Sequence, residues 1–340
     1  MTDEARAAPL TAAVSDHDVL NTTLAAAVDA RLARQAVVPL PGRGDTLTRW
    51  RVLAELARAD VCVAKVLEAH YDAQAILADL DGQAAAADAC AGGLLGVWAA
   101  EPADARVTFV ATGNCGAGIL EGTKAWCSGS DLVDAALVTA HEDGQRVLVH
   151  VDMASAGIDR DDADWQAVGM ARVRSGRVRF ERTPARRIGE PGAYLQRPGF
   201  WHGGAGIAAC WFGAAAGIAD TLRTDIRAGR SPHAQAHLGA IDIALSATAS
   251  LLRETARLID AMPDQPHVRA VTRVRSHAER AATEVIDRVG RALGPGPLCS
   301  DAAHARRCAD LTTFIRQSHA EHDWAALGAA VQADGQAWTL

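Results

Sequence analysis

Residues that could carry chemistry are concentrated between Gly122 and Gly129, where the chain reads GTKAWCSG. Trp126 offers an aromatic wall and Ser128 a hydroxyl donor, while a turn at Gly129 exposes backbone N–H groups. A flat, electron-accepting ring suits such a surface, because its face can stack on the indole while its edge accepts hydrogen bonds. The segment therefore predicts a surface of the flavin-binding type.

Titratable side chains gather a second time near the end of the chain, where residues 319–323 read HAEHD. A carboxylate can act as a general base, and an imidazole can do so near neutral pH. Glu321 and His319 are therefore candidate catalytic residues. The same composition is also typical of a helix face exposed to water, so the run alone does not decide between the two.

Several kinds of site have no signal in the sequence. The seven cysteines are scattered without a CxxC pair, which indicates neither a disulfide framework nor a structural zinc site. We find no Gly-x-Gly-x-x-Gly run after a strand, Walker loop, Gly-x-Ser-x-Gly elbow or helical His/Glu metal motif. Nucleotide hydrolysis, serine hydrolysis and a metal site are therefore not expected.

Charge and hydropathy limit the expected partners. The formal net charge is −7 and Lys and Arg form no consecutive block, so neither nucleic acid nor an anionic membrane is an expected partner. Residues 1–18 lack the basic and apolar regions of a signal peptide. Apolar runs such as 207–219 are too short to span a bilayer. These features predict a cytoplasmic protein with reduced thiols.

The chain divides into three parts by hydrophobic periodicity, which predicts an α+β fold. Residues 1–95 have apolar side chains at helical spacing and form the predicted N-terminal α-helical domain. Residues 96–197 contain short β-branched runs, typical of a middle antiparallel β domain. Residues 198–340 return to the helical period and form the predicted C-terminal α-helical bundle.

Local signals place individual elements within these parts. Asp143-Gly144 lies between two β-branched runs and predicts a hairpin. Ser231-Pro232 is a favourable N-cap and first-turn pair. The elements expected are a helix over 61–80, strands over 106–110, 135–140, 146–151 and 177–180, and bundle helices that start at 231 and run over 268–293 and 301–330.

Four segments in this order resemble the acyl-CoA dehydrogenase family over residues 45–340. GTKAWCSG is similar to the family's Gly-x-Lys-x-Trp-x-(Thr/Ser) run, and Glu101-Pro102 to its Thr-Glu-Pro. Trp165-x-x-x-Gly169-Met170 is similar to its strand before the substrate face, and the final bundle completes the match. The resemblance implies non-covalent FAD, a homodimer or homotetramer, and oxidoreductase chemistry.

The resemblance also implies roles for particular residues. It places Trp126, Cys127 and Ser128 against the flavin ring. Arg227 and His237 fall where the family has an Arg and a Gln that bind the FAD pyrophosphate of the neighbouring subunit. Two further cofactor-binding candidates, Gly294 and Gly296, fall in the family's glycine-rich loop near the diphosphate, although Pro295 and Pro297 remove two backbone donors there.

The family's catalytic base is missing from its usual place. Aligned on Asp310 and Phe314, the position of the family's Glu falls on Gln317 or Ser318, and the alternative site falls near Ile207. None of these side chains is a base. In a continuous helix, Glu321 would lie one turn after Gln317 on the same face, which makes Glu321, with His319, the replacement to consider.

Three functions therefore stay open. The default is FAD-dependent α,β-dehydrogenation of an acyl thioester, with an electron acceptor as partner. The missing Glu favours a flavin-dependent monooxygenase on the same fold, which needs a flavin reductase and no α-proton base. The absence of an Arg/Asp pair near residues 205–208 puts a CoA thioester in doubt. The third possibility is a catalytically inactive scaffold or binding subunit.

Overall fold

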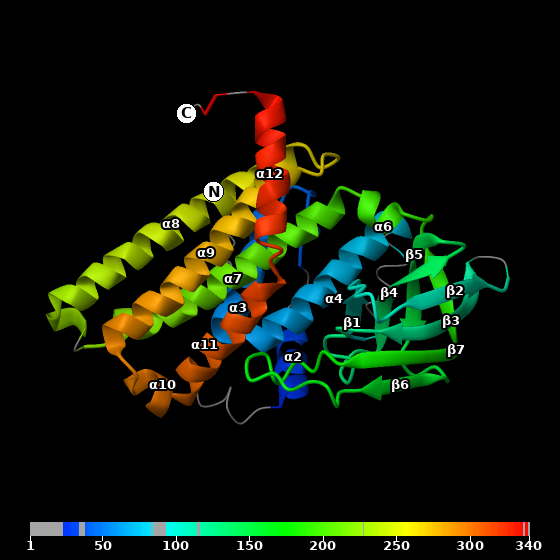
Figure 1. Ribbon diagram of the computed structural model, residues 1–340, viewed down its shortest axis with the longest axis horizontal. Helices are drawn as coiled ribbons and strands as arrows, with labels where there is room; N and C mark the ends of the chain where they lie inside the picture. The colour runs from blue at the N-terminus through cyan, green and yellow to red at the C-terminus, as the bar shows by residue number, and fades with distance from the viewer. Residues whose placement is uncertain are drawn as a thin grey trace, which may run out of the picture.

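The computed structural model consists of a seven-stranded sheet beside a set of long helices (Figure 1). It describes residues 23–33, 38–82, 84, 93–113, 116–226, 228–335 and 337–338. The sheet lies at one end of the molecule and the long helices extend away from it. Helices from both ends of the sequence share this helical layer, because α3 and α4 pack against α7.

The first described elements are α2 (Leu24–Leu32), α3 (Thr46–Ala59) and α4 (Val61–Leu80). Asp60 separates the last two, and its carboxylate caps α4 by accepting hydrogen bonds from the backbone N–H groups of Cys62 and Val63 at 2.9 and 3.2 Å. Helix α4 occupies the predicted range. It contacts both β1 and α7, so it lies at the junction of the sheet and the bundle.

The sheet closes on itself. Its strand order is β1-β4-β2-β3-β7-β5, with a further pairing of β5 to β4 and with β6 beside β7. The strands are β1 (Leu95–Trp98), β2 (Val107–Ala111), β3 (Ala117–Lys124), β4 (Ala135–Glu142), β5 (Gln145–Asp152), β6 (Ile158–Asp161) and β7 (Arg177–Ile188).

The sheet is mixed, whereas the sequence predicted an antiparallel one. β1 pairs with β4 in parallel, and β2 also meets β4 in parallel through Thr108 and His141. The reason is that the β2–β3 excursion separates β1 from β4 in the chain and lets β4 return in the direction of β1. The other pairings are antiparallel, including the predicted hairpin β4–β5, where Asp143 and Gly144 have φ values of +47° and +80°.

The bundle begins with the short helix α6 (Ala193–Gln196) and the long helix α7 (Gly199–Thr224). A 3-10 turn η1 (Ala228–Arg230) leads to α8 (Pro232–Ala261), α9 (Val268–Leu293) and α10 (Gly296–Ser300). Ser231 caps α8 as predicted, since its hydroxyl accepts from the backbone N–H of Ala234 at 3.3 Å. Helix α9 matches its predicted range and ends at Gly294, which has a φ of +69°.

Helix α7 is the apolar centre of the bundle. With 26 residues it is long and apolar enough to cross a membrane by length and composition, and it contains the run 207–219, but 72% of its most apolar window is buried in the fold. Gly213 lies so close to α3 that a Cβ there would overlap the Ala54 carbonyl. Packing against α3 and α9 thus accounts for the apolar composition of α7.

The predicted helix over 301–330 is interrupted, and this corrects the sequence interpretation. Helix α11 (Ala302–Phe314) passes into a 3-10 turn η2 (Ile315–Gln317), and α12 (Glu321–Asp334) starts afresh. Ser318 is extended and Ala320 has a φ of +39°. Gln317 and Glu321 therefore do not share a face of one continuous helix.

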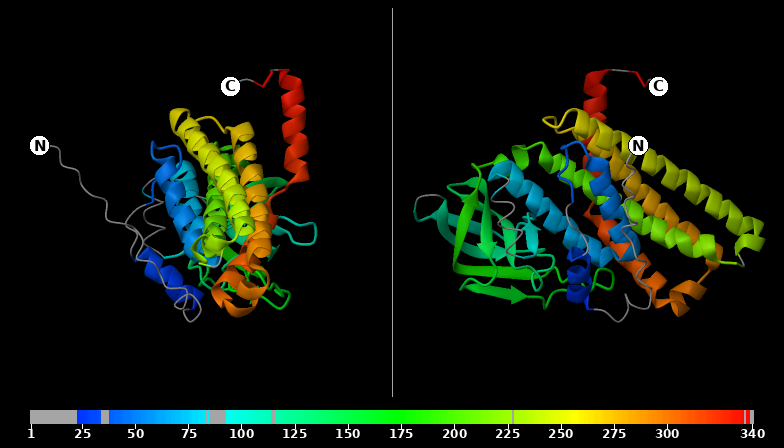
Figure 2. Two further views of the ribbon diagram at one scale, coloured as in Figure 1. Left: turned by 90° about the vertical axis from the view of Figure 1, so that its left-hand side faces the viewer. Right: turned by 180° about the vertical axis from the view of Figure 1, so that it is seen from behind.

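Helix α12 stands apart from the other helices in the left view of Figure 2. Its main contact is with α9, and none of its residues is buried. The charged run of residues 319–323 is located where α12 begins.

Candidate active site

Trp126 follows β3 in an unusual backbone conformation. Its φ is +59° and its side chain is 60% exposed. A left-handed conformation is unfavourable for a bulky residue and persists only where the surroundings hold it. The backbone N–H of Ser128 donates to the Trp126 carbonyl at 3.0 Å and closes the turn. The turn therefore presents a large indole to the solvent.

A cavity of about 280 Å³ opens beside this indole. Trp165 forms its second aromatic wall, with ring centroids 6.4 Å apart and the two rings nearly perpendicular at 83°. The residues that line the cavity are Pro102, Asp104, Ala125, Trp126, Asp164, Trp165, Ser175, Gly176 and Arg177. The structure thus brings the predicted Trp126 segment together with Trp165, Ser175 and Arg177. Of these three residues, only Trp165 belongs to a segment that the sequence analysis singled out.

The hydroxyl of Ser128 is half-buried and bonded inside the protein. It lies 2.9 Å from the Ser175 hydroxyl, which donates to the Val173 carbonyl at 3.0 Å. A hydroxyl has one proton, so Ser128 is then the donor to Ser175. The carbonyl of Ser128 accepts from the Trp98 indole at 3.2 Å. To donate to a ligand, the Ser128 hydroxyl must rotate away from Ser175.

Cys127 is fully buried and points inward. Its thiol lies 3.4 Å from the Lys124 carbonyl, and its backbone N–H donates to the Gly176 carbonyl at 3.0 Å. Burial raises the pKa of the thiol to about 12, so the sulfur stays protonated at neutral pH. Cys127 anchors the turn, since its thiol, its backbone N–H and its carbonyl are all bonded inside the protein.

Lys124 connects the Trp126 turn to the rest of the sheet. The side chain is 1% exposed, and its ammonium donates to the carbonyl and the hydroxyl of Thr139 at 2.8 and 2.7 Å. The Thr139 hydroxyl in turn donates to Glu101 at 2.8 Å. The sequence contained Lys124 and Glu101 only as members of separate motifs, because their proximity depends on the sheet register.

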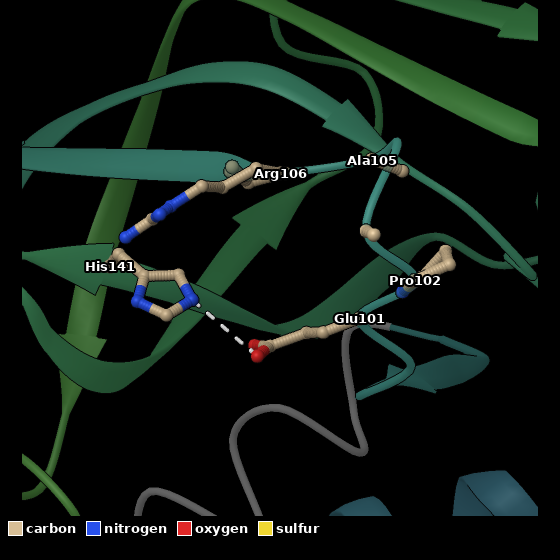
Figure 3. Close-up of a pocket in the computed structure, with 7 residues that line it drawn as sticks. Glu101, Pro102, Ala105, Arg106 and His141 are labelled. Carbon is tan, nitrogen blue, oxygen red and sulfur yellow. Dashed lines mark ion pairs between the residues drawn. The ribbon is translucent and has the colours of Figure 1, made fainter.

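A second cavity, of about 190 Å³, lies beside this network and shares Pro102 with the first (Figure 3). Glu101 is 3.4 Å from His141 and accepts from Arg146 at 2.6 Å. Burial acts to raise the pKa of Glu101, but the hydrogen bonds from Thr139 and Arg146 outweigh it, so that the pKa is lowered. Glu101 is therefore an ionised acceptor that fixes the loop between the two cavities.

We expect the buried Lys124 to make stability depend on pH. Burial lowers its pKa from 10.5 to about 8, so between these values the unfolded chain binds more protons at this side chain. The unfolding free energy should rise with pH across that window, by at most about 1.4 kcal/mol per unit. In denaturant titrations the wild type should therefore gain stability relative to Lys124→Met from pH 8 to 10. A constant difference would show that Lys124 is not perturbed in this way.

Two titratable residues of α4, His70 and Glu68, are buried away from these cavities. His70 lies 2.9 Å from Gln74 and accepts from the backbone N–H of Leu95 at 3.1 Å. Burial lowers the pKa of His70 to about 4, as expected of a neutral core histidine. Glu68 lies 3.3 Å from Lys65, and burial raises its pKa. Neither His70 nor Glu68 lines the cavity beside Trp126.

The two candidate catalytic residues lie on the exposed segment that begins α12. Glu321 is exposed, and the side chain of His319 is 77% exposed. Neither belongs to the lining of the two described cavities. The structure describes them as accessible groups, and their role as a base stays a prediction.

The phosphate-binding candidates lie elsewhere. His237 is half-buried on α8, and its Nδ1 is buried without a hydrogen-bond partner. Gly294 follows α9 and Gly296 begins α10, and a Cβ at either would meet open space. Both α10 and the start of α8 lie at the end of the bundle away from the sheet (Figure 1). Arg227 lies outside the described residues.

Comparison with solved structures identifies the fold as one shared by acyl-CoA dehydrogenases and certain monooxygenases. The dibenzothiophene monooxygenase TdsC from Paenibacillus sp. A11-2 is 21% identical, with a TM-score of 0.74 over 86% of this chain and 84% of that one. TdsC has also been solved with FMN bound. The methanesulfinate monooxygenase MsuC from Pseudomonas fluorescens is 19% identical, with a TM-score of 0.71 over 86% and 84% of the chains.

The butyryl-CoA dehydrogenase from Megasphaera elsdenii is 16% identical, with a TM-score of 0.73 over 85% of this chain and 82% of that one. The sequence itself matches no protein-family model and no curated protein. The chain therefore has the acyl-CoA dehydrogenase fold, and the resemblance drawn from the sequence is confirmed at the level of the fold.

Proposed function

We propose that the chain is a flavin-dependent oxidoreductase whose flavin ring packs against Trp126. The observation that carries this proposal is the exposed, left-handed Trp126 beside a cavity with a second indole wall. The backbone conformation of Trp126 is unfavourable for a bulky residue, and it exposes a large apolar side chain to water. Both features are typical of a site where a ligand covers the side chain. The shared fold supports the proposal, since both dehydrogenases and monooxygenases have it.

The residues present fit a flavin ring. Trp126 offers the stacking face, and the Ser128 hydroxyl offers a polar contact to the ring edge once it rotates away from Ser175. The backbone N–H groups of residues 127–130 are already bonded inside the protein. When bound, the flavin supplies the acceptor or donor of a hydride. The chain's own contribution is to orient that ring: Lys124 and Glu101 hold the turn, and Trp165 restricts access of water.

We further propose that the cofactor is FAD shared between subunits of a homodimer or homotetramer. The cavity of about 280 Å³ is at the small end of ligand sites, which hold roughly 300–1,000 Å³. It suits a ring system better than a whole dinucleotide. The candidates for the pyrophosphate, His237, Gly294 and Gly296, lie at the far end of the bundle, which suits contact with the cofactor of a second copy. A sedimenting monomer with stoichiometric FAD would contradict this arrangement.

The first candidate reaction is α,β-dehydrogenation of an acyl thioester. It requires a base to remove the α-proton while the hydride leaves. Two carboxylates line the cavity, but Asp104 is paired with Arg177 at 2.6 Å and is 63% exposed. The hydrogen bond from Arg177 lowers the pKa of Asp104, and Asp164 is 86% exposed. Glu321 and His319, the candidates from the sequence, lie outside the lining of this cavity, and their role as the base stays a prediction.

The second candidate reaction is monooxygenation by reduced flavin, supplied by a partner reductase. The observation that favours it is the lack of a carboxylate at Gln317 and Ser318, together with the pairing of Asp104 with Arg177, which lowers the pKa of Asp104 and weakens it as a base. A monooxygenase has no need of an α-proton base. The solved monooxygenases TdsC and MsuC show that this fold accommodates such activity.

One set of assays separates these functions. A dehydrogenase should lose its flavin absorbance when mixed anaerobically with an acyl-CoA. A monooxygenase should resist that treatment and consume oxygen when NADH and a flavin reductase supply reduced flavin. Protein that holds flavin and does neither supports a scaffold or binding subunit. Protein that binds no flavin would overturn the proposal as a whole.

A further inference from the structure

We infer that His319, His322 and Asp323 form a binding site for a divalent transition-metal ion of the Zn²⁺ class. One ligand atom from each of these side chains lies within 4.8 Å of the other two. The three residues occur at the start of α12, across the break that separates it from α11. The inference depends on these side chains alone and is independent of flavin binding.

The spacing of the ligand atoms suits a tetrahedral ion. Asp323 Oδ1 lies 3.7 Å from the Nδ1 of His319 and 3.5 Å from the Nδ1 of His322. Zinc binds nitrogen and oxygen at about 2.0–2.2 Å, so neighbouring ligands of a tetrahedral site lie about 3.3–3.5 Å apart. The two distances from Asp323 are therefore close to those of a tetrahedral site. Rotation of the exposed imidazoles can adjust the remaining distance, between His319 and His322.

Asp323 supplies the negative charge that a bound cation needs. Among the described residues, both ion-pair contacts of Asp323 are with these imidazoles, and the Arg275 guanidinium also acts on Asp323 electrostatically. An imidazole is charged only when protonated, and in its neutral form it is a nitrogen ligand for metals. Glu321 adds a second carboxylate in the same helical turn, which offsets the positive end of the α12 dipole.

The ligand set selects the class of ion. Two imidazoles and one carboxylate suit zinc, copper or nickel, whereas Mg²⁺ and Ca²⁺ prefer oxygen ligands alone. The side chains of His319 and His322 are 77% and 84% exposed. The site is therefore reachable from solvent and leaves a coordination position for water or for a group from another molecule.

The test is a zinc titration of the tag-free protein after treatment with a chelator and dialysis. The exposed Cys299 is replaced in every sample by Cys299→Ser, because a free thiol also binds zinc. Competition with a chromophoric chelator then measures affinity and stoichiometry. We expect one saturable Zn²⁺ per chain and no comparable binding of Mg²⁺ or Ca²⁺.

Variants decide whether these side chains are the ligands. His322→Ala and Asp323→Asn should each lower zinc affinity at least about tenfold, since changes to groups behind a metal's direct ligands already cost that much. His233→Ala, which removes an exposed histidine of α8, should bind as the parent does. Circular dichroism confirms that each variant is folded. Undiminished affinity in both ligand variants, or no saturable binding in the parent, would overturn the inference.

Discussion

Anaerobic reduction of the bound flavin by an acyl-CoA should slow by about 10²–10⁴-fold in the Glu321→Gln variant if Glu321 is the base of a dehydrogenase. The substitution keeps the shape of the side chain and removes its basicity, and general-base catalysis contributes on that scale. The same loss is expected of His319→Asn if the imidazole is the base. Stopped-flow absorbance of the flavin measures the rate directly.

The matched control is Glu254→Gln, an exposed glutamate of α8 that is 63% exposed and paired with Arg257. Its rate should equal that of wild type. Flavin binding should persist in all three variants, so that a slower rate reflects chemistry. If neither Glu321→Gln nor His319→Asn slows reduction, the assignment of the base is wrong. A wild type that no acyl-CoA reduces, yet that consumes oxygen with reduced flavin, would instead support the monooxygenase.

Flavin affinity should fall about 10- to 100-fold in the Trp126→Gly variant while the protein becomes no less stable. Loss of a stacked aromatic ring costs roughly 1–3 kcal/mol, and each 1.4 kcal/mol is tenfold in affinity. Glycine adopts the φ of +59° without strain, so the turn itself should relax. Fluorescence titration with FAD and a thermal melt of the apoprotein give the two quantities.

Two further variants control this experiment. Trp126→Phe keeps an aromatic face and should recover part of the affinity. Trp324→Ala removes a tryptophan of α12 that is 39% exposed and should leave affinity unchanged. Equal flavin affinity in Trp126→Gly and wild type would place the ring elsewhere, and a marked loss of stability would show that Trp126 serves the fold.

The elements that the sequence predicts best have local signals at their ends. Helix α4 has Asp60 at its start, and α9 ends at Gly294, so both match their predicted ranges. Asp143-Gly144 likewise forms the predicted hairpin. In each case the residues that set the boundary are neighbours in the chain, and short-range chemistry is sufficient.

Features that depend on distant parts of the chain were missed. β1 has four residues and pairs in parallel with β4, which no local pattern indicates. The break between α11 and α12 contains neither Pro nor Gly, and it requires the left-handed Ala320. The expectation that the chain has no metal site is untested, and the site proposed at His319, His322 and Asp323 would overturn it.

The candidate site was predicted in part. The Trp126 segment was singled out from its residue types, and the structure places it at a cavity. Its left-handed backbone, the bond between Ser128 and Ser175, and the link from Lys124 to Glu101 all depend on the packing of several strands. Residue types indicate which ligand a surface suits, whereas orientation follows only from the assembled sheet.

The flavin content of the purified protein tests the central claim most directly. Absorbance after denaturation, compared with protein concentration, gives the number of flavins per chain. We predict close to one FAD per chain, either as isolated or after reconstitution, and a lower flavin content in Trp126→Gly. A colourless protein that takes up neither FAD nor FMN would contradict the account.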